Sequence, residues 1–145
     1  LTIAIQVGLL LAFITFIYRI SSLSRYESAS VNDFPELRQH LGSIAAFRIY
    51  GAIFFGAVKL LESIENELPS KALVLDLKNV IYIDVSGMDA LLELEEACKA
   101  RDIQLLICGL AHQPYEMAVR GGLLERLPAD RVYPDLQHGI AAAAS

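Results

Sequence analysis

The segment of residues 84–89 (DVSGMD) contains the side chains with the strongest chemical potential, because it follows an apolar strand-like run and precedes a helix-like pattern. The first amides of a helix have no partner within the helix and attract anions. A phosphate on Ser86 would gain from that end but would be repelled by Asp84 and Asp89. A switch at Ser86, with Asp84 and Gly87 as its neighbours, is therefore one interpretation of the segment.

A purely structural role explains the same segment. Ser86 or Asp84 is expected as the N-cap of the following helix, and Asp89 stands where a capping box would place an acidic residue if Ser86 were the cap. Such a cap contributes about 1 kcal/mol to stability. Both interpretations remain open on the residues alone.

Other catalytic or ligand-binding patterns are missing from the sequence. Ser86 has no glycine two positions before it, so the G-x-S-x-G motif of hydrolases is not matched. Neither the G-x-G-x-x-G motif nor the P-loop motif of nucleotide-binding proteins occurs. The three histidines, His40, His112 and His138, have no second ligand residue at a spacing typical of metal sites. We therefore expect no enzyme, no metal site and no cofactor; a small hydrolase or nucleotide-using protein is supported only by the α/β pattern, which is a weak guide.

Charge and cysteine content narrow the class of partner and the compartment. From residue 26 onward the chain has 10 basic and 17 acidic residues, so nucleic-acid binding is excluded because it requires a basic face. Cys98 and Cys108 match neither a disulfide framework nor a zinc motif. This cysteine pattern is typical of a reducing cytosol.

The first 18 residues are apolar and uncharged, and as a helix they would extend about 27 Å. Their start lacks the features of a signal peptide. Tyr18 supplies an interfacial aromatic group, and Arg19 and Arg25 supply positive charges after the apolar segment. These residues predict the end of a transmembrane helix that leaves the membrane on the cytoplasmic side. A buried helix of a soluble protein or an oligomer is the alternative. The predicted organisation is the end of a transmembrane helix over 1–20, a linker over 21–44 and a domain over 45–145.

Strand-like and helix-like segments alternate through the predicted domain, which places it in the α/β class. We expect a mixed, mostly parallel sheet of about four to five strands packed with about four helices, and preceded by the apolar helix. The expected strands are 46–50 and 52–55 (two strands or one bent strand), 72–77 continuing through 80–83, 103–110 and 132–133. The expected helices are 35–41, 57–68, 88–100, 114–120 and one after 135.

Three stretches together resemble a known family. Residues 73–94 (LVLDLKNVIYIDVSGMDALLEL) resemble the signature of STAS domains, in which a buried strand leads to a D-x-[ST]-G turn and a helix. Residues 47–64 are similar to the strand-turn-strand-helix of STAS domains in SulP anion permeases, and the apolar start resembles the end of the SulP transport unit. Val85 stands where the family often has a small residue.

The resemblance implies a non-catalytic regulatory or interaction domain on the cytoplasmic side of a multi-pass, sulfate-like anion transporter in the cell membrane. Its implied partners are the transporter's own membrane domain, a soluble cytoplasmic protein and a second copy of the chain. The alternative that it implies is a signalling regulator of the anti-sigma-factor-antagonist type, in which Ser86 matches the phosphorylated residue.

Overall fold

The fold is built on one sheet of five strands in the order β1-β2-β3-β4-β5. The computed structural model describes residues 1–23, 25–29, 34–40, 42–53, 58–128 and 131–144. β1 is antiparallel to β2 and the other neighbours are parallel, so the predicted mixed, mostly parallel sheet is confirmed. The strands are β1 (Arg25–Ser28), β2 (Ile44–Ile53), β3 (Ala72–Ile83), β4 (Gln104–Cys108) and β5 (Val132–Tyr133).

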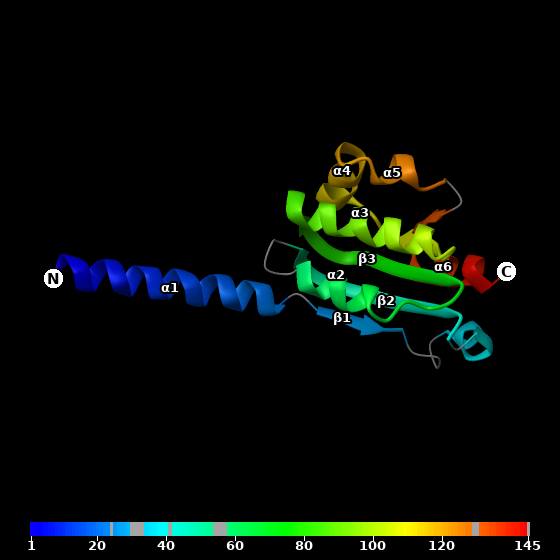
Figure 1. Cartoon of the computed structure of the whole chain (residues 1–145), viewed down its shortest axis with the longest axis horizontal. Helices are drawn as coiled ribbons and strands as arrows, with labels where there is room; N and C mark the ends of the chain where they lie inside the picture. Colours follow the sequence, from blue (N-terminus) through cyan, green and yellow to red (C-terminus); the bar gives the residue numbers. More distant parts are fainter. Residues whose placement is uncertain (24, 30–33, 41, 54–57, 129–130, 145) are drawn as a thin grey trace.

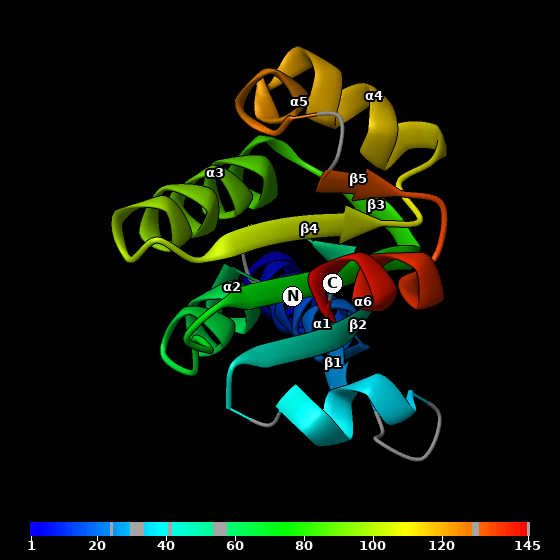
Figure 2. The same ribbon diagram turned by 90° about the vertical axis from the view of Figure 1, so that its right-hand side faces the viewer.

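Helices cover both faces of this sheet (Figures 1 and 2), which is the layer arrangement expected for alternating strands and helices. One face packs against α2 (Val58–Glu65), α3 (Val85–Ala100), α4 (His112–Arg120) and α5 (Leu123–Arg126). The other face packs against the short 3-10 helix η1 (Pro35–His40) and α6 (Leu136–Ala144).

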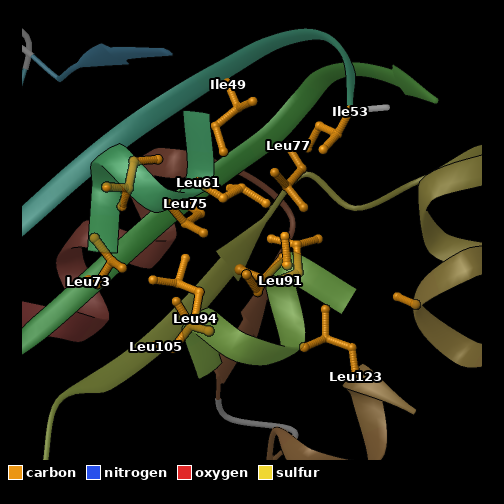
Figure 3. Packing of buried hydrophobic residues seen from close by; sticks show 14 of the residues in the cluster. Ile49, Ile53, Leu61, Leu73, Leu75, Leu77, Leu91, Leu94, Leu105 and Leu123 are labelled. Carbon is orange, nitrogen blue, oxygen red and sulfur yellow. The ribbon is translucent and has the colours of Figure 1, made fainter. Parts of the chain in front are cut away.

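β3 is the central strand and supplies both cores. Leu73, Leu75 and Leu77 point toward α2 and α3, while Ala72 and Val74 point toward α6. All five are at most 1% exposed, because successive side chains of a strand face opposite sides and both sides are covered here. Figure 3 shows the larger core, in which leucines of β3 meet those of α2 and α3.

α1 (Thr2–Leu23) projects away from the sheet (Figure 1), and residues 1–19 are all exposed. The helix is long and apolar enough between Thr2 and Arg19 to cross a membrane, by length and composition. The alternative of a helix buried within this chain is therefore wrong, since nothing in the described structure covers its apolar surface.

The linker expected over residues 21–44 contains parts of the packed domain. β1 pairs with β2, and Tyr26 lies edge-on against Phe47 with ring centroids 5.4 Å apart. Phe34 and Leu37 join the core below α6. β1 was not predicted because its four residues include a single large apolar side chain, which is too few to show the alternation of a strand.

β2 is one bent strand, the second of the two forms considered for residues 46–55, of which 54 and 55 lie outside the described residues. Its pairing with β3 shifts between Arg48 and Tyr50 and again between Gly51 and Ala52. Such irregularities bend a strand without ending it. The antiparallel partner that makes the sheet mixed is therefore β1.

Candidate functional site

Asp84 caps α3 at the junction of β3 and the helix. Its carboxylate oxygen accepts a hydrogen bond of 2.8 Å from the backbone N–H of Gly87, and its carbonyl accepts one of 2.9 Å from Met88. The backbone N–H of Asp84 donates to Ile53 of β2 at 3.2 Å. α3 begins at Val85, so the N-cap is Asp84, one of the two residues that the sequence predicted for this position.

Gly87 holds the start of α3 close to the end of β2. A Cβ atom at this position would lie 2.5 Å from the carbonyl oxygen of Ile53 and 2.8 Å from its Cγ2 atom. Contacts that short do not occur between real atoms, so only glycine permits this approach. The glycine of the D-x-S-G turn is thus explained by packing.

Ser86 lies in the first turn of α3 and is half-buried. The capping-box interpretation, with Ser86 as the cap and Asp89 as its partner, is wrong because Asp84 occupies the cap position. Asp89 is exposed on α3. Ser86 therefore does not provide the side-chain cap of this helix.

Gln113 ties α4 to the same junction, although the sequence analysis did not single it out. Its side-chain oxygen accepts from the backbone N–H of Ile83 and its amide nitrogen donates to the carbonyl of Ile83, both at 2.8 Å. The amide thus satisfies both backbone groups of the last residue of β3. α4 begins at His112, two residues before the predicted start. A single glutamine near the start of a helix is not a recognisable motif, so the sequence alone did not indicate this contact.

Exposed large apolar side chains gather around this junction. Outside α1, the described residues of this kind come from the end of β3, the start of α3 and the helix α4: Ile81, Tyr82, Val85, Tyr115 and Val119. Ile81 is 75% exposed and Val85 66%. We call these five residues the exposed apolar group. Ile81, Tyr82 and Val85 lie at the carboxyl end of β3, so a sheet edge that is normally covered by polar loops has apolar side chains here.

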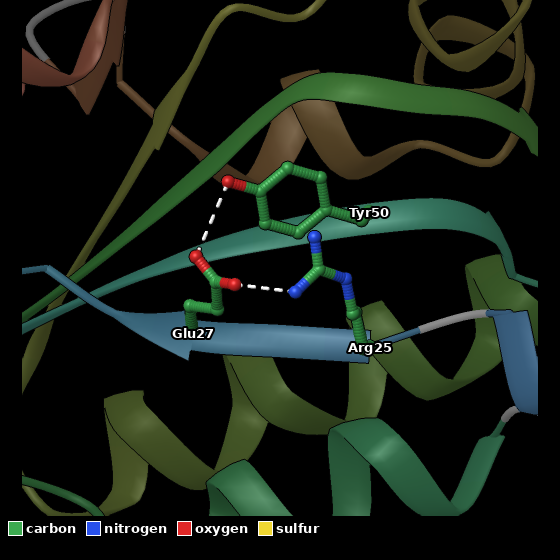
Figure 4. Close-up of polar contacts among 3 residues, drawn as sticks. All are labelled: Arg25, Glu27 and Tyr50. Carbon is green, nitrogen blue, oxygen red and sulfur yellow. Dashed lines mark hydrogen bonds and ion pairs between the residues drawn. The ribbon is translucent and has the colours of Figure 1, made fainter.

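The end of α1 reaches the same edge of the sheet through β1. Arg25 pairs in register with Tyr50 near the end of β2, and its guanidinium lies 4.4 Å from the centre of the Tyr50 ring. Glu27 forms an ion pair with Arg25 and accepts a hydrogen bond of 3.4 Å from the Tyr50 hydroxyl (Figure 4). The three side chains fasten the exit of α1 to the sheet.

The remaining candidate residues are dispersed. Within the described ranges, no three histidine, cysteine or acidic side chains are grouped so that they could hold a metal ion. His138 pairs with Asp135, whose pKa is lowered by the backbone N–H and the ring of His138. Both cysteines are free and buried, and burial raises the pKa of Cys98 to about 11 and that of Cys108 to about 12.

Glu95 is paired with a residue far along the chain. It stands four residues before Lys99 on the same helix, a spacing at which opposite charges can pair, but Glu95 is only 7% exposed and its carboxylate lies 3.5 Å from the guanidinium of Arg126 in α5. Arg126 also contacts Glu96 at 3.0 Å. Glu95 is thus paired with a residue 31 positions along the chain, in α5.

Known proteins resemble this chain in sequence and fold. YvdB of Bacillus subtilis (strain 168), a protein named for a proposed sulfate transport activity, is 32% identical over 130 residues. That alignment covers 88% of this chain but 24% of YvdB, so the chain spans about a quarter of that relative.

Two solved structures cover most of the domain. A sulfate transporter family protein from Wolinella succinogenes is 32% identical with a TM-score of 0.63, and the match covers 71% of this chain and 85% of that one. The STAS domain of a SulP transporter from Vibrio cholerae is 25% identical with a TM-score of 0.62, covering 79% and 94%. The STAS domain family model matches residues 35–139. This chain therefore belongs to the STAS domain family, and it is similar to the STAS domains of sulfate transporter family and SulP proteins.

Proposed function

We propose that this chain is the cytoplasmic regulatory and interaction domain of a membrane anion transporter and that α1 is the end of a transmembrane helix. The observation that carries the proposal is the fully exposed apolar helix fastened directly to a STAS fold. An apolar helix of this length without cover in water is unfavourable, whereas a bilayer would bury it.

One observation supports a cytoplasmic position for the sheet, and another supports a sulfate-like substrate. Arg19 and Arg25 follow the apolar segment, and positive charges beside a membrane helix favour the cytoplasmic side. The names of YvdB and of the two solved relatives all refer to sulfate or SulP transport. A sulfate-like anion is accordingly the first substrate to test in the longer protein.

The exposed apolar group is proposed to dock on the transporter's own membrane unit. It lies at the sheet edge from which α1 leaves, so a membrane unit joined to α1 would face this edge. Exposed apolar side chains that gather in one region are a common mark of an interaction site. We assign this contact to the membrane unit because of that shared edge, and a soluble partner is left to the experiment.

Deleting residues 1–20 tests the role of α1. The shortened chain is expected to stay folded and to become soluble without detergent, since the described core contains no residue of α1. The measurement is circular dichroism together with sedimentation after detergent removal. Unfolding of the shortened chain would contradict the membrane assignment.

The docking surface is tested in the full-length transporter by Ile81→Ser combined with Val85→Ser. We expect anion uptake to fall while the isolated domain keeps its thermal unfolding temperature, because both side chains are exposed and stabilise no core. Glu62→Ser combined with Glu67→Ser is the matched control, since both are exposed near α2 away from this edge. If uptake is unchanged, and a soluble protein from the same cytoplasm loses binding, the partner is that protein.

A second candidate function is phosphorylation at Ser86. It is favoured by the position of Ser86 in the first turn of α3, where a phosphate would meet the positive end of the helix. Ser86→Asp should then change uptake in the full-length protein while Ser86→Ala prevents labelling by phosphate. Equal uptake in wild type and both variants, with no phosphate on Ser86, would remove this candidate.

A further inference from the structure

A cavity of about 480 Å³ lies at the amino edge of the sheet. Its walls come from the starts of β3 and β4, the end of α3, and α5 with the residues that follow it. Figure 1 places these elements at the end of the sheet away from α1. The cavity is therefore separate from the exposed apolar group.

The cavity concentrates positive charge in an acidic protein. Of the 12 basic residues of the chain, four line the cavity, namely Lys71, Lys99, Arg126 and Arg131. The acidic side chains among its described lining residues are Glu95 and Asp102. The chain as a whole carries a net charge of −5, so the local excess of positive charge is opposite in sign to the protein.

The buried acid does not neutralise this excess. Arg126 is shared by Glu95 and Glu96, and with Asp102 these three carboxylates leave one net positive charge from the four cations. Within the described part of the chain, the side chains of Lys71, Lys99 and Arg131 form no ion pair or hydrogen bond. Three cations that converge on one cavity repel each other, and a bound anion would relieve that repulsion.

Size and charge together define the class of ligand. Small-molecule sites have volumes of about 300 to 1,000 Å³, and this cavity lies within that range. The three cations come from different elements, so a ligand with charges at separate points would contact more of them than a single oxyanion. We propose that the cavity binds a small multivalent anion that carries phosphate or carboxylate groups.

Isothermal titration calorimetry of the whole chain in non-ionic detergent tests the proposal, with pyrophosphate and citrate as probes at constant ionic strength. We expect saturable binding of at least one probe, which also identifies phosphate or carboxylate as the preferred group. Affinity should fall as salt is raised, since exposed charges are screened. No saturable heat with either probe would overturn the proposal.

Lys99→Gln combined with Arg131→Gln should weaken that binding at least about tenfold, because two cationic contacts are lost. Lys59→Gln combined with Arg120→Gln is the matched control, since both residues are exposed and neither lines the cavity. Lys71→Gln provides a second, single variant if the double variant unfolds. Unchanged affinity in the cavity variants, or an equal loss in the control, would show that the anion binds elsewhere.

Discussion

The two edges of one sheet differ in chemistry. At the carboxyl edge, Asp84, Gly87 and Gln113 form close backbone contacts beneath exposed apolar side chains. At the amino edge, four cationic side chains line a cavity, and those of Lys71, Lys99 and Arg131 form no ion pair with another described residue. This difference indicates that the D-x-S-G turn at the carboxyl edge first holds strands and helices together. The amino edge, which has no recognisable sequence motif, has the properties of a ligand site.

The largest expected effect comes from Gly87→Ala. The added Cβ would collide with the backbone oxygen of Ile53, so the free energy of unfolding should fall by about 3 kcal/mol, measured by urea denaturation. Gly42→Ala at the amino edge is the comparison. Its Cβ would meet open space, and only its φ of +84° is unfavourable, at a cost of about 1 to 2 kcal/mol. Equal losses would contradict the tight packing at the carboxyl edge.

Local patterns in the sequence predicted most of the fold. The apolar run of β3 and the helical spacing of Leu61 and Ile64 in α2 gave the correct elements, because each pattern is complete within a short window. β1 and α5 were missed since four residues are too few for a period. Gly121 is the last cap of α4 and Gly122 is the first cap of α5. The φ of +81° at Gly122 separates the two helices.

Gln113→Leu is expected to have the next largest effect. It leaves the backbone N–H and carbonyl of Ile83 without their partners, and should lower the free energy of unfolding by about 2 kcal/mol. Hydrogen exchange at the Ile83 amide should accelerate more than exchange in β4. Gln137→Leu, on the exposed side of α6, is the control. A similar small change in both variants would mean that the Gln113 amide does not support β3.

Asp84→Ala should remove about 1 kcal/mol from the free energy of unfolding, because the Gly87 amide loses its cap. Ser86→Ala should change it by less than about 0.5 kcal/mol, since Ser86 is not the cap. Thermal or urea unfolding of the two variants separates a structural from a regulatory role for the hydroxyl. If Ser86→Ala lowers the free energy of unfolding as much as Asp84→Ala, the Ser86 hydroxyl has a structural role.

The site was less predictable than the fold. The D-x-S-G turn was located correctly between a strand and a helix. Asp84 and Ser86 are both common N-cap residues, and only the backbone geometry shows that Asp84 is the cap. The contact of Gln113 with Ile83 spans 30 residues. The cavity cations at positions 71, 99 and 126 are 27 or more residues apart along the chain, so only the fold brings them together.

The smallest effect is expected at the amino edge, from Lys71→Gln and Arg131→Gln. Removing either cation relieves repulsion, so stability at low ionic strength should rise by about 0.5 kcal/mol or less and the gain should vanish in about 1 M salt. Arg126→Gln should change stability in the opposite direction, because the Glu95 side chain, only 9% exposed, would lose its cation. If all three variants lose stability, the cations at this edge stabilise the fold, and the prediction that they repel one another in the absence of an anion is wrong.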